Sequence, residues 1–235
     1  MMRLLRRLIR PSTPPTLKST SAYALWAATY PPHAHNALME IEQAAMLRLM
    51  PELRGRDVLD LACGTGRYGL IAAERGARRV VGVDNSLPML KAGQLQGAAE
   101  AMSARLPFAA ETFDVVLCGL ALGHLPRAEL VSTLAEISRV LRPGGVLLFS
   151  DFHPYVYLNG GRRTFTSPDG KTYAVEHYVY FPSEYFTLLR DSTMILNGFE
   201  EPRTMLGGIE LPAVLVMRGE KPLTVRGAGQ HEQQL

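Results

Sequence analysis

A short apolar run that ends in closely spaced glycines constrains the fold of this chain more than any other segment. Asp57 to Cys63 is apolar apart from two aspartates, and it leads directly into Gly64 and Gly66. This pattern predicts a buried strand followed by a sharp turn, because glycine permits tight bends and a close approach of the backbone to a ligand. A helical pattern follows from Arg67 to Arg75 and stops at Gly76. The segment therefore reads as strand, glycine turn and helix.

The alternation of strand and helix continues through the middle of the chain. Further buried strands are predicted at 79–84, 113–118 and 146–150, with an amphipathic helix between the last two. The apolar face of that helix is formed by Leu130, Leu134, Ile137 and Leu141. Right-handed crossovers place the helices of such units on both faces of a parallel sheet. We therefore predict a doubly wound α/β fold with a mostly parallel sheet.

The length of the chain favours a single domain with tails. Its 235 residues suffice for one well-buried core and are few for two. We place the domain at 21–218, after a basic tail at 1–20 that we expect to be disordered and before a flexible tail at 219–235. Met1–Arg10 could instead form a basic amphipathic helix, as an organelle-targeting segment or a weak membrane-surface contact.

The pattern changes after the strand that we predict at 146–150. The segments 164–166 and 172–181 flank the sequence Ser-Pro-Asp-Gly at 167–170, which predicts a β-hairpin with a tight turn. This insertion, at about 154–182, is longer than most connections in α/β proteins. We expect it to form a lid over the substrate.

Composition excludes several classes of protein. No apolar run reaches the length of a membrane span, and the net charge of +3 comes without a basic stretch interleaved with aromatic residues. Nucleic acid is therefore not an expected partner. Cys63 and Cys118 can build neither a disulfide framework nor a metal cluster, which indicates a reducing compartment and a cytoplasmic location.

Two aspartates at the ends of predicted strands indicate the kind of ligand. Ligands of open α/β sheets bind outside the carboxyl ends of the strands. Gly64, Gly66 and Gly69 also fit the dinucleotide fingerprint, so an NAD-linked oxidoreductase is one alternative. A carboxylate at Asp60, however, suits the cationic methionyl end of S-adenosylmethionine (SAM) better than a pyrophosphate. Asp84 is placed to accept hydrogen bonds from ribose hydroxyls with either ligand.

At these residues the chain resembles the class I SAM-dependent methyltransferases. The segments 58–66 (VLDLACGTG) and 81–86 (VGVDNS) are similar to the first two motifs of that family. The segments 106–116, with LPF and FDVV, and 141–145 (LRPGG) are similar to later motifs of its small-molecule, methyltransferase type 11-like branch. The resemblance runs from Tyr23 to Pro154. It implies a seven-stranded sheet, with the hairpin inserted after the fifth strand.

The resemblance also implies which residues bind SAM. Those on the methionine side are Asp60, Ala62, Gly64 and Gly66, beneath Tyr30 from a segment that folds over the cofactor. Asp84 then holds the ribose, Asn85 and Met89 flank the adenine, and Leu120 and Leu125 close the pocket.

One departure from the family pattern concerns the adenine site. Ala101-Met-Ser-Ala104 stands where the family usually carries an acidic partner for the adenine amino group. Ser103 or a backbone carbonyl substitutes for it in our interpretation. The missing acid also leaves open a non-catalytic SAM-binding or partner subunit as an alternative.

Histidines and tyrosines near the strand ends are candidates for the acceptor side. His124 and His153 are the predicted catalytic residues, because each follows a strand that ends at the cleft. His124 could instead only pack over the cofactor. Predicted substrate-binding residues on the hairpin and the helix after it are His177, Tyr178, Tyr180 and Tyr185. Cross-strand packing is the alternative role for each of them.

Missing motifs narrow the acceptor. The strand at 113–118 lacks the Asn/Asp-Pro-Pro-Tyr sequence that follows it in methyltransferases of nucleic acid bases, and no magnesium or zinc ligand spacing is visible. The sequence thus predicts a metal-independent methyl transfer from SAM, with S-adenosylhomocysteine (SAH) as product, to an O, N or C atom of a small metabolite. A monomer or a homodimer is expected.

Overall fold

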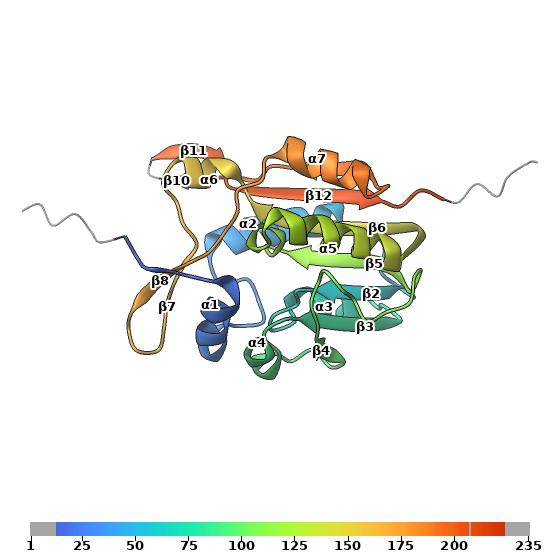
Figure 1. The fold of residues 1–235 in the computed structure, drawn as a ribbon, viewed down its shortest axis with the longest axis horizontal. Helices are drawn as coiled ribbons and strands as arrows, with labels where there is room; N and C mark the ends of the chain where they lie inside the picture. Colours follow the sequence, from blue (N-terminus) through green and yellow to red (C-terminus); the bar gives the residue numbers. More distant parts are fainter. Residues whose placement is uncertain (1–12, 207, 224–235) are drawn as a thin grey trace, which may run out of the picture.

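The structure, a computed structural model, describes residues 13–206 and 208–223. At its centre lies a seven-stranded sheet in the order β4-β3-β2-β5-β6-β12-β9 (Figure 1). Its strands are β2 (Asp57–Leu61), β3 (Arg79–Asp84), β4 (Ala98–Glu100), β5 (Phe113–Gly119), β6 (Leu141–Phe152), β9 (Ile195–Glu200) and β12 (Val214–Glu220). The predicted doubly wound α/β fold with a mostly parallel seven-stranded sheet is confirmed.

The strands run parallel from β4 to β6, and those at the other edge are antiparallel. Leu59 of β2 lies between Val81 of β3 and Val116 of β5 in the parallel part. β12 pairs in the antiparallel sense with both β6 and β9. Every residue of β2 is buried, because helices cover both faces of the sheet. The carboxyl ends of the parallel strands meet at one edge, where ligands of such sheets bind.

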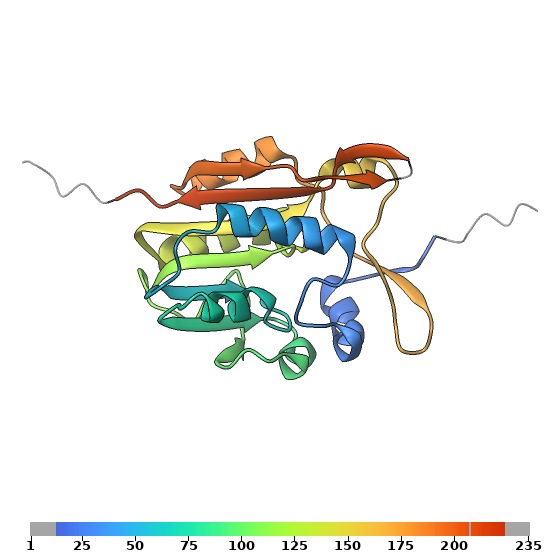
Figure 2. The ribbon, with the colours of Figure 1, turned by 180° about the vertical axis from the view of Figure 1, so that it is seen from behind.

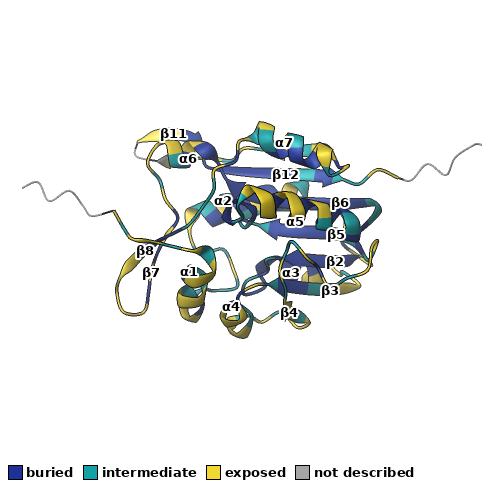
Figure 3. Cartoon of the chain, in the orientation of Figure 1, coloured by how far each residue is buried: buried dark blue, intermediate teal, exposed yellow. Residues whose placement is uncertain are grey.

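A hydrophobic core fills each side of the sheet. One core contains side chains of α2 and α3, and the other contains side chains of α5 and α7 (Figures 1 and 2). Successive side chains of a strand point to opposite cores, and the strands form the buried centre of the molecule (Figure 3). These helices are α2 (Ala37–Leu49), α3 (Arg67–Glu74), α5 (Arg127–Val140) and α7 (Pro182–Asp191); α4 (Leu87–Ala92) follows β3.

A smaller unit lies beyond the carboxyl ends of the parallel strands (Figure 1). It combines the N-terminal segment with the insertion, because β1 pairs in parallel with β8 and β8 pairs with β7. Ala22, Phe165 and Val175 form a small third core between them. Its elements are β1 (Thr16–Leu17), α1 (Ser19–Trp26), the 3-10 turn η1 (Ala27–Thr29), β7 (Thr164–Thr166) and β8 (Thr172–Val175). The helix α6 (Pro154–Leu158), at the start of the insertion, instead contributes Val156 to the core that contains side chains of α2 and α3.

The predicted tails are shorter than expected where the structure describes them. Residues 13–20 were expected to be disordered, but they contain β1 and the start of α1. The strand β12 includes 219 and 220, and the ammonium group of Lys221 donates to the carbonyls of Ser138 and Leu141. Residues 1–12, with the predicted basic helix, and 224–235 lie outside the described residues. No helix within the described residues is long and apolar enough to cross a membrane.

The hairpin is confirmed, but its second strand is shorter than predicted. We expected a strand at 172–181, and β8 ends at Val175. Beyond it, the amide of Tyr178 donates to the carbonyl of Gly123, which lies in the 3-10 turn η2 (Leu122–His124) after β5. This bond directs the chain away from the hairpin and toward the carboxyl end of β5 in the main sheet. Our sequence predictions also omit β4, β9, α6 and the hairpin of β10 (Arg203–Leu206) and β11 (Ile209–Pro212).

Candidate functional site

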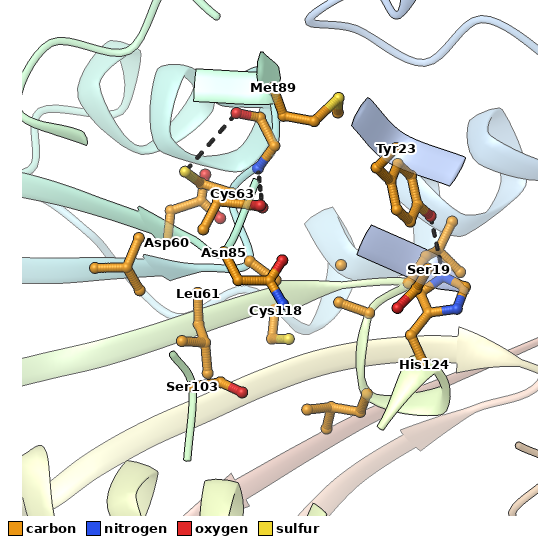
Figure 4. A pocket seen from close by; sticks show the side chains of 18 of the residues that line it. Ser19, Tyr23, Asp60, Leu61, Cys63, Asn85, Met89, Ser103, Cys118 and His124 are labelled. Atoms are coloured by element: carbon orange, nitrogen blue, oxygen red, sulfur yellow. Dashed lines mark hydrogen bonds between the residues drawn. The ribbon is translucent and has the colours of Figure 1, made fainter. Parts of the chain in front are cut away.

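A pocket opens at the carboxyl ends of β2, β3 and β5, and α1 and the insertion form its opposite wall. Most of the predicted cofactor residues line it, together with one predicted catalytic histidine. They are Tyr30, Asp60, Ala62, Gly64, Asp84, Asn85, Met89, Ser103, Leu120, Leu125 and His124. In Figure 4, Asp60, Cys63 and Met89 lie on one side of the pocket, and Tyr23, Ser19 and His124 lie on the other. The pocket therefore has two chemically different ends.

The glycine turn has the geometry that its sequence predicts. Gly64 and Gly66 have φ angles of +55° and +94°, which favour glycine. A Cβ atom on Gly66 would lie 2.6 Å from the Cβ of Leu95, and one on Gly64 would lie 3.0 Å from the Cε of Met89. Gly66 does not line the pocket; it caps α3 just behind it. A side chain at either position would therefore collide with a neighbouring side chain, which explains why the turn needs glycine.

Asp84 braces the turn that follows β2. Its Oδ2 accepts a hydrogen bond from the amide of Gly64, and its Oδ1 accepts one from the amide of Ser86, both at 2.8 Å. Burial raises the pKa of Asp84, and these amide bonds oppose that shift. Each carboxylate oxygen can accept a further bond from a ligand hydroxyl.

Asp60 is the more deeply buried carboxyl group, with 2% of its surface exposed. Its Oδ2 accepts from the amide of Gly69 in the first turn of α3, at 2.7 Å. Burial raises the pKa of Asp60 to about 7, although the Gly69 amide and the charge of Arg67 both act to lower it. Asp60 therefore changes its charge near neutral pH, on the floor of the pocket.

Two residues that are not glycine adopt left-handed backbone conformations at the strand ends. Ala62, after β2, and Leu120, after β5, have φ angles of 54° and 55°. Both line the pocket, and the amide of Leu120 is held by the carbonyl and hydroxyl oxygens of Ser150. Such strained residues cluster at ligand sites, because the surrounding structure must hold them in place.

Arg67 is a pocket residue that we did not predict. It is 8% exposed, and its Nη1 donates to Oε2 of Glu42 in α2 at 2.7 Å. Glu42 also accepts hydrogen bonds from the hydroxyl groups of Tyr68 and Ser150. This fully buried carboxylate therefore neutralises Arg67 within a saturated network.

His124 and Tyr23 form a hydrogen-bonded pair at the other end of the pocket. Nδ1 of His124 lies 2.7 Å from the carbonyl oxygen of Glu176. A carbonyl only accepts, so Nδ1 carries the proton and Nε2 accepts from the hydroxyl of Tyr23 at 3.0 Å. Burial lowers the pKa of His124 to about 3 and raises that of Tyr23. Both groups are neutral at physiological pH.

Arg163, from the insertion, reaches into the same end of the pocket. Its Nη2 donates to the hydroxyl of Tyr30 at 3.2 Å. The guanidinium carbon lies 5.2 Å from the ring centre of Phe152 and 5.5 Å from those of Tyr23 and Trp26. The predicted cofactor residue Tyr30 is thus connected to the insertion. Neither Arg163 nor Tyr23 has a local sequence signal, because α1 and the insertion meet only through long-range folding.

The structure places His153, the other predicted catalytic residue, outside the pocket lining. Its Nδ1 accepts from the amide of Tyr155 and so caps the N-terminus of α6. Its Nε2 lies 3.0 Å from a carboxylate oxygen of Glu201. The position of His153 supports a structural role at the end of β6 in place of contact with an acceptor.

The predicted substrate-binding residues also lie behind the pocket wall. Nε2 of His177 donates to Asp151 at 3.0 Å, and the hydroxyl of Tyr185 donates to the other oxygen of the same carboxylate at 2.6 Å. Tyr180 donates to the carbonyl of Leu125 at 2.8 Å, and Tyr178 packs against the core. None of the four lines the pocket. Tyr178 and Tyr180 hydrogen bond to the segment that carries His124 and Leu125, whereas His177 and Tyr185 bond to Asp151 at the end of β6. Among the described residues, no group of three His, Cys, Asp or Glu side chains could hold a metal ion.

Comparison with known proteins identifies one matching family model and several relatives of this chain. Residues 58–145 match the family model described as a methyltransferase domain. The chain is 35% identical over 134 residues to malonyl-[acyl-carrier protein] O-methyltransferase of Salmonella typhimurium, covering 55% of this chain and 51% of that protein. It is 34% identical over 140 residues to demethylmenaquinone methyltransferase of Lactococcus lactis, covering 51% and 53%. The matches thus span about half the length of these two relatives.

The fold is also shared with solved structures. The SAM-dependent methyltransferase of Mesorhizobium loti superposes with a TM-score of 0.63 at 22% identity, covering 77% of this chain and 97% of that one. At this identity the likeness concerns the fold. The family match covers the strand, glycine turn and aspartates from which the pocket floor is built.

Proposed function

We propose that the chain is a class I SAM-dependent methyltransferase and that it transfers the methyl group of SAM to an O, N or C atom of a small organic metabolite. The methyltransferase-domain match at 58–145 and the shared fold support this proposal. One observation carries this proposal. A single pocket joins an end with one buried and one half-buried carboxyl group, Asp60 and Asp84, to an end lined by aromatic side chains and the guanidinium of Arg163. The first end suits the cofactor, and the second suits an acceptor.

The residues at the first end fit SAM. Gly64 lines the pocket without a side chain, and a Cβ there would lie 3.0 Å from the Cε of Met89, another lining residue. Asp84 would hold the ribose hydroxyls, and Asp60 would lie on the side of the positive charge. Asn85 and Met89 would flank the adenine, and Ser103, which hydrogen bonds to Thr133 at 3.0 Å, lies beside them in the pocket lining. When bound, SAM supplies an electrophilic methyl group on a sulfonium.

The protein's own contribution to catalysis is positioning and the exclusion of water. His124 is neutral, with a pKa of about 3, so it is a weak base at physiological pH. Its Nε2 instead orients the hydroxyl of Tyr23 at the acceptor end. We therefore assign His124 as a positioning residue for Tyr23. We expect the acceptor atom to accept the methyl group without prior deprotonation by a strong base of the protein.

The two relatives support an organic acceptor. One is named for a malonyl group on acyl-carrier protein and the other for demethylmenaquinone. Their names differ in acceptor, while each matches about half of this chain at 34–35% identity. This fits a family in which the sheet keeps the cofactor site and the added segments choose the acceptor.

Calorimetry followed by a methyl-transfer assay tests the proposal. We expect SAM and SAH to bind to the purified chain and NAD not to bind. Incubation of the protein and radiolabelled SAM with a metabolite extract should then label a small organic product. Binding of NAD in place of SAM would overturn the assignment. Binding of SAM without any labelled product would favour the non-catalytic SAM-binding alternative.

A further inference from the structure

Two buried arginines line the pocket, and they differ in how their charge is compensated. Arg67 and Arg163 are each 8% exposed. Arg67 is paired with Glu42 at 2.7 Å. For Arg163, the described part of the chain offers no carboxylate within ion-pair distance. A buried charge without a counter-ion is costly, so such groups are retained where a ligand supplies the partner.

The surroundings of Arg163 satisfy its guanidinium only in part. Phe152, Tyr23 and Trp26 present rings 5.2–5.5 Å from the guanidinium carbon. Ring faces attract a cation but do not neutralise it. One in-plane bond is made, from Nη2 to the hydroxyl of Tyr30. The Nε–H is buried and lacks a hydrogen-bond partner among the described residues. The group thus retains both a charge and a donor for a ligand.

The position of Arg163 points to the acceptor and away from the cofactor. Phe152, one of its ring neighbours, is the last residue of β6, whereas Asp60 belongs to β2. β5 separates these two strands in the sheet. The guanidinium nearer to the cofactor end is that of Arg67. It lies at the end of β5, since its Nη2 would be 3.3 Å from a Cβ placed on Gly119. Arg163 instead lies beside Tyr23, which bonds to His124.

We propose that the methyl acceptor carries a carboxylate group and that Arg163 is the specificity-determining residue that binds it. This inference rests on the proposed methyltransferase function and narrows its acceptor class. A single carboxylate matches the one unpaired positive charge, and its planar shape matches the planar donor fork of arginine. The aromatic rings around the guanidinium fit a flat, unsaturated acceptor body.

Binding of two matched probes to the SAH-loaded protein tests the proposal. Benzoate and benzamide have nearly the same shape, but only benzoate carries a charge. We expect calorimetry to show benzoate binding at least about tenfold more tightly than benzamide, because a charge-assisted bond replaces a neutral one. In Arg163→Met this preference should disappear, while the affinity for SAH stays at the wild-type value.

Three further variants and one melting curve complete the test. Arg162→Met removes the same charge from the exposed neighbour of Arg163 and should leave the preference for benzoate intact. Arg163→Lys should keep part of it, because the charge remains without the fork. Tyr30→Phe should weaken it, because Tyr30 holds Nη2 in place. Arg163→Met without ligands should melt no lower than the wild type, because it removes an uncompensated buried charge.

Several results would overturn the inference while leaving the methyltransferase assignment standing. Equal affinity of the wild type for the two probes is one, and no binding of benzoate up to about 10 mM is another. A loss of SAH affinity in Arg163→Met with an unchanged benzoate preference would place Arg163 at the cofactor. A lower melting temperature with an unchanged preference would make it structural. Failure of SAH to bind to the wild type would instead contradict the proposed function itself.

Discussion

The two ends of the pocket are built in different ways. At the cofactor end, Asp60 and Asp84 are held by backbone amides within one strand–turn–helix unit and its neighbouring strand. At the acceptor end, Tyr23, His124 and Arg163 come from segments far apart in the sequence and are held by side-chain contacts. The difference suggests a division of work: backbone geometry specifies a constant cofactor, and exchangeable side chains specify the acceptor.

The largest effect should come from removing the brace of the cofactor end. Asp84→Ala takes a charged acceptor from the pocket and frees the amides of Gly64 and Ser86. We expect SAM binding to weaken by about 1–3 kcal/mol in calorimetry. Glu100→Ala, which removes an exposed carboxylate from β4, serves as the control and should bind normally. Unchanged affinity in Asp84→Ala would remove this residue from the cofactor site.

A substitution at the acceptor end, Tyr23→Phe, should lower turnover without changing the affinity of the cofactor end for SAH. Tyr23→Phe leaves Nε2 of His124 without its hydrogen-bond donor. We expect turnover with an acceptor found in the extract assay to fall about tenfold, through misplacement of the acceptor. The affinity for SAH should stay the same. Tyr173→Phe, on β8 and outside the pocket lining, is the matched control. A parallel loss of SAH affinity would show that the two ends are not independent.

Asp60 should make the cofactor end sensitive to pH. Its pKa of about 7 means that the carboxyl group is largely protonated at pH 6 and ionised at pH 8. A positive sulfonium favours the ionised form, so the affinity for SAM should rise several-fold over this interval by roughly the linkage that a pKa shift implies. SAH, whose sulfur is neutral, should respond less. In Asp60→Asn, the affinities for SAM and for SAH should show the same dependence on pH. If the affinity for SAM still rises more than that for SAH, another group titrates.

The same shift has a consequence for stability. Because the folded pKa of Asp60 lies above its ordinary value of 3.8, the stability that its protonated form contributes is lost as the pH rises through about 7. The free energy of unfolding of Asp60→Asn, from urea titrations, should therefore fall less between pH 6 and pH 8 than that of the wild type.

A substitution of His153 should have a smaller effect, and it tests whether this residue belongs to the acceptor end. His153→Ala removes the side-chain cap of α6, which typically costs about 1 kcal/mol in the free energy of unfolding. Turnover should be close to that of the wild type, since the side chain lies outside the pocket lining. A large loss of turnover at normal stability would restore the catalytic role that the sequence predicts for it.

The smallest effect concerns backbone strain at the cofactor end. Ala62→Gly relieves a left-handed conformation of φ 54° but also loosens the unfolded chain. We expect a net gain of about 0.5 kcal/mol in the free energy of unfolding, measured in urea. A loss of stability would indicate that the methyl group of Ala62 makes contacts worth more than the strain.

How far the sequence predicts each end follows the same division. Asp60, Gly64 and Asp84 are set by local patterns, an apolar run and the turn after it, and such patterns are legible in one chain. Arg163 sits in a Gly-Gly-Arg-Arg stretch that has no periodicity, and only the tertiary fold buries it. The alternation at 172–181 predicted a longer strand, but the bond between Tyr178 and Gly123 diverts the chain. β4 was missed because its three residues are too short for a pattern.

The parallel pairing of Thr16 and Leu17 with Ala174 and Val175 connects the N-terminal segment to the inserted hairpin. If the insertion acts as the expected lid, we expect the N-terminal segment and the inserted hairpin to move together when a small molecule enters or leaves past Arg163. Deletion of the few residues before Ser19 that form β1 should therefore loosen both the N-terminal segment and the hairpin, although neither β1 nor β8 lines the pocket.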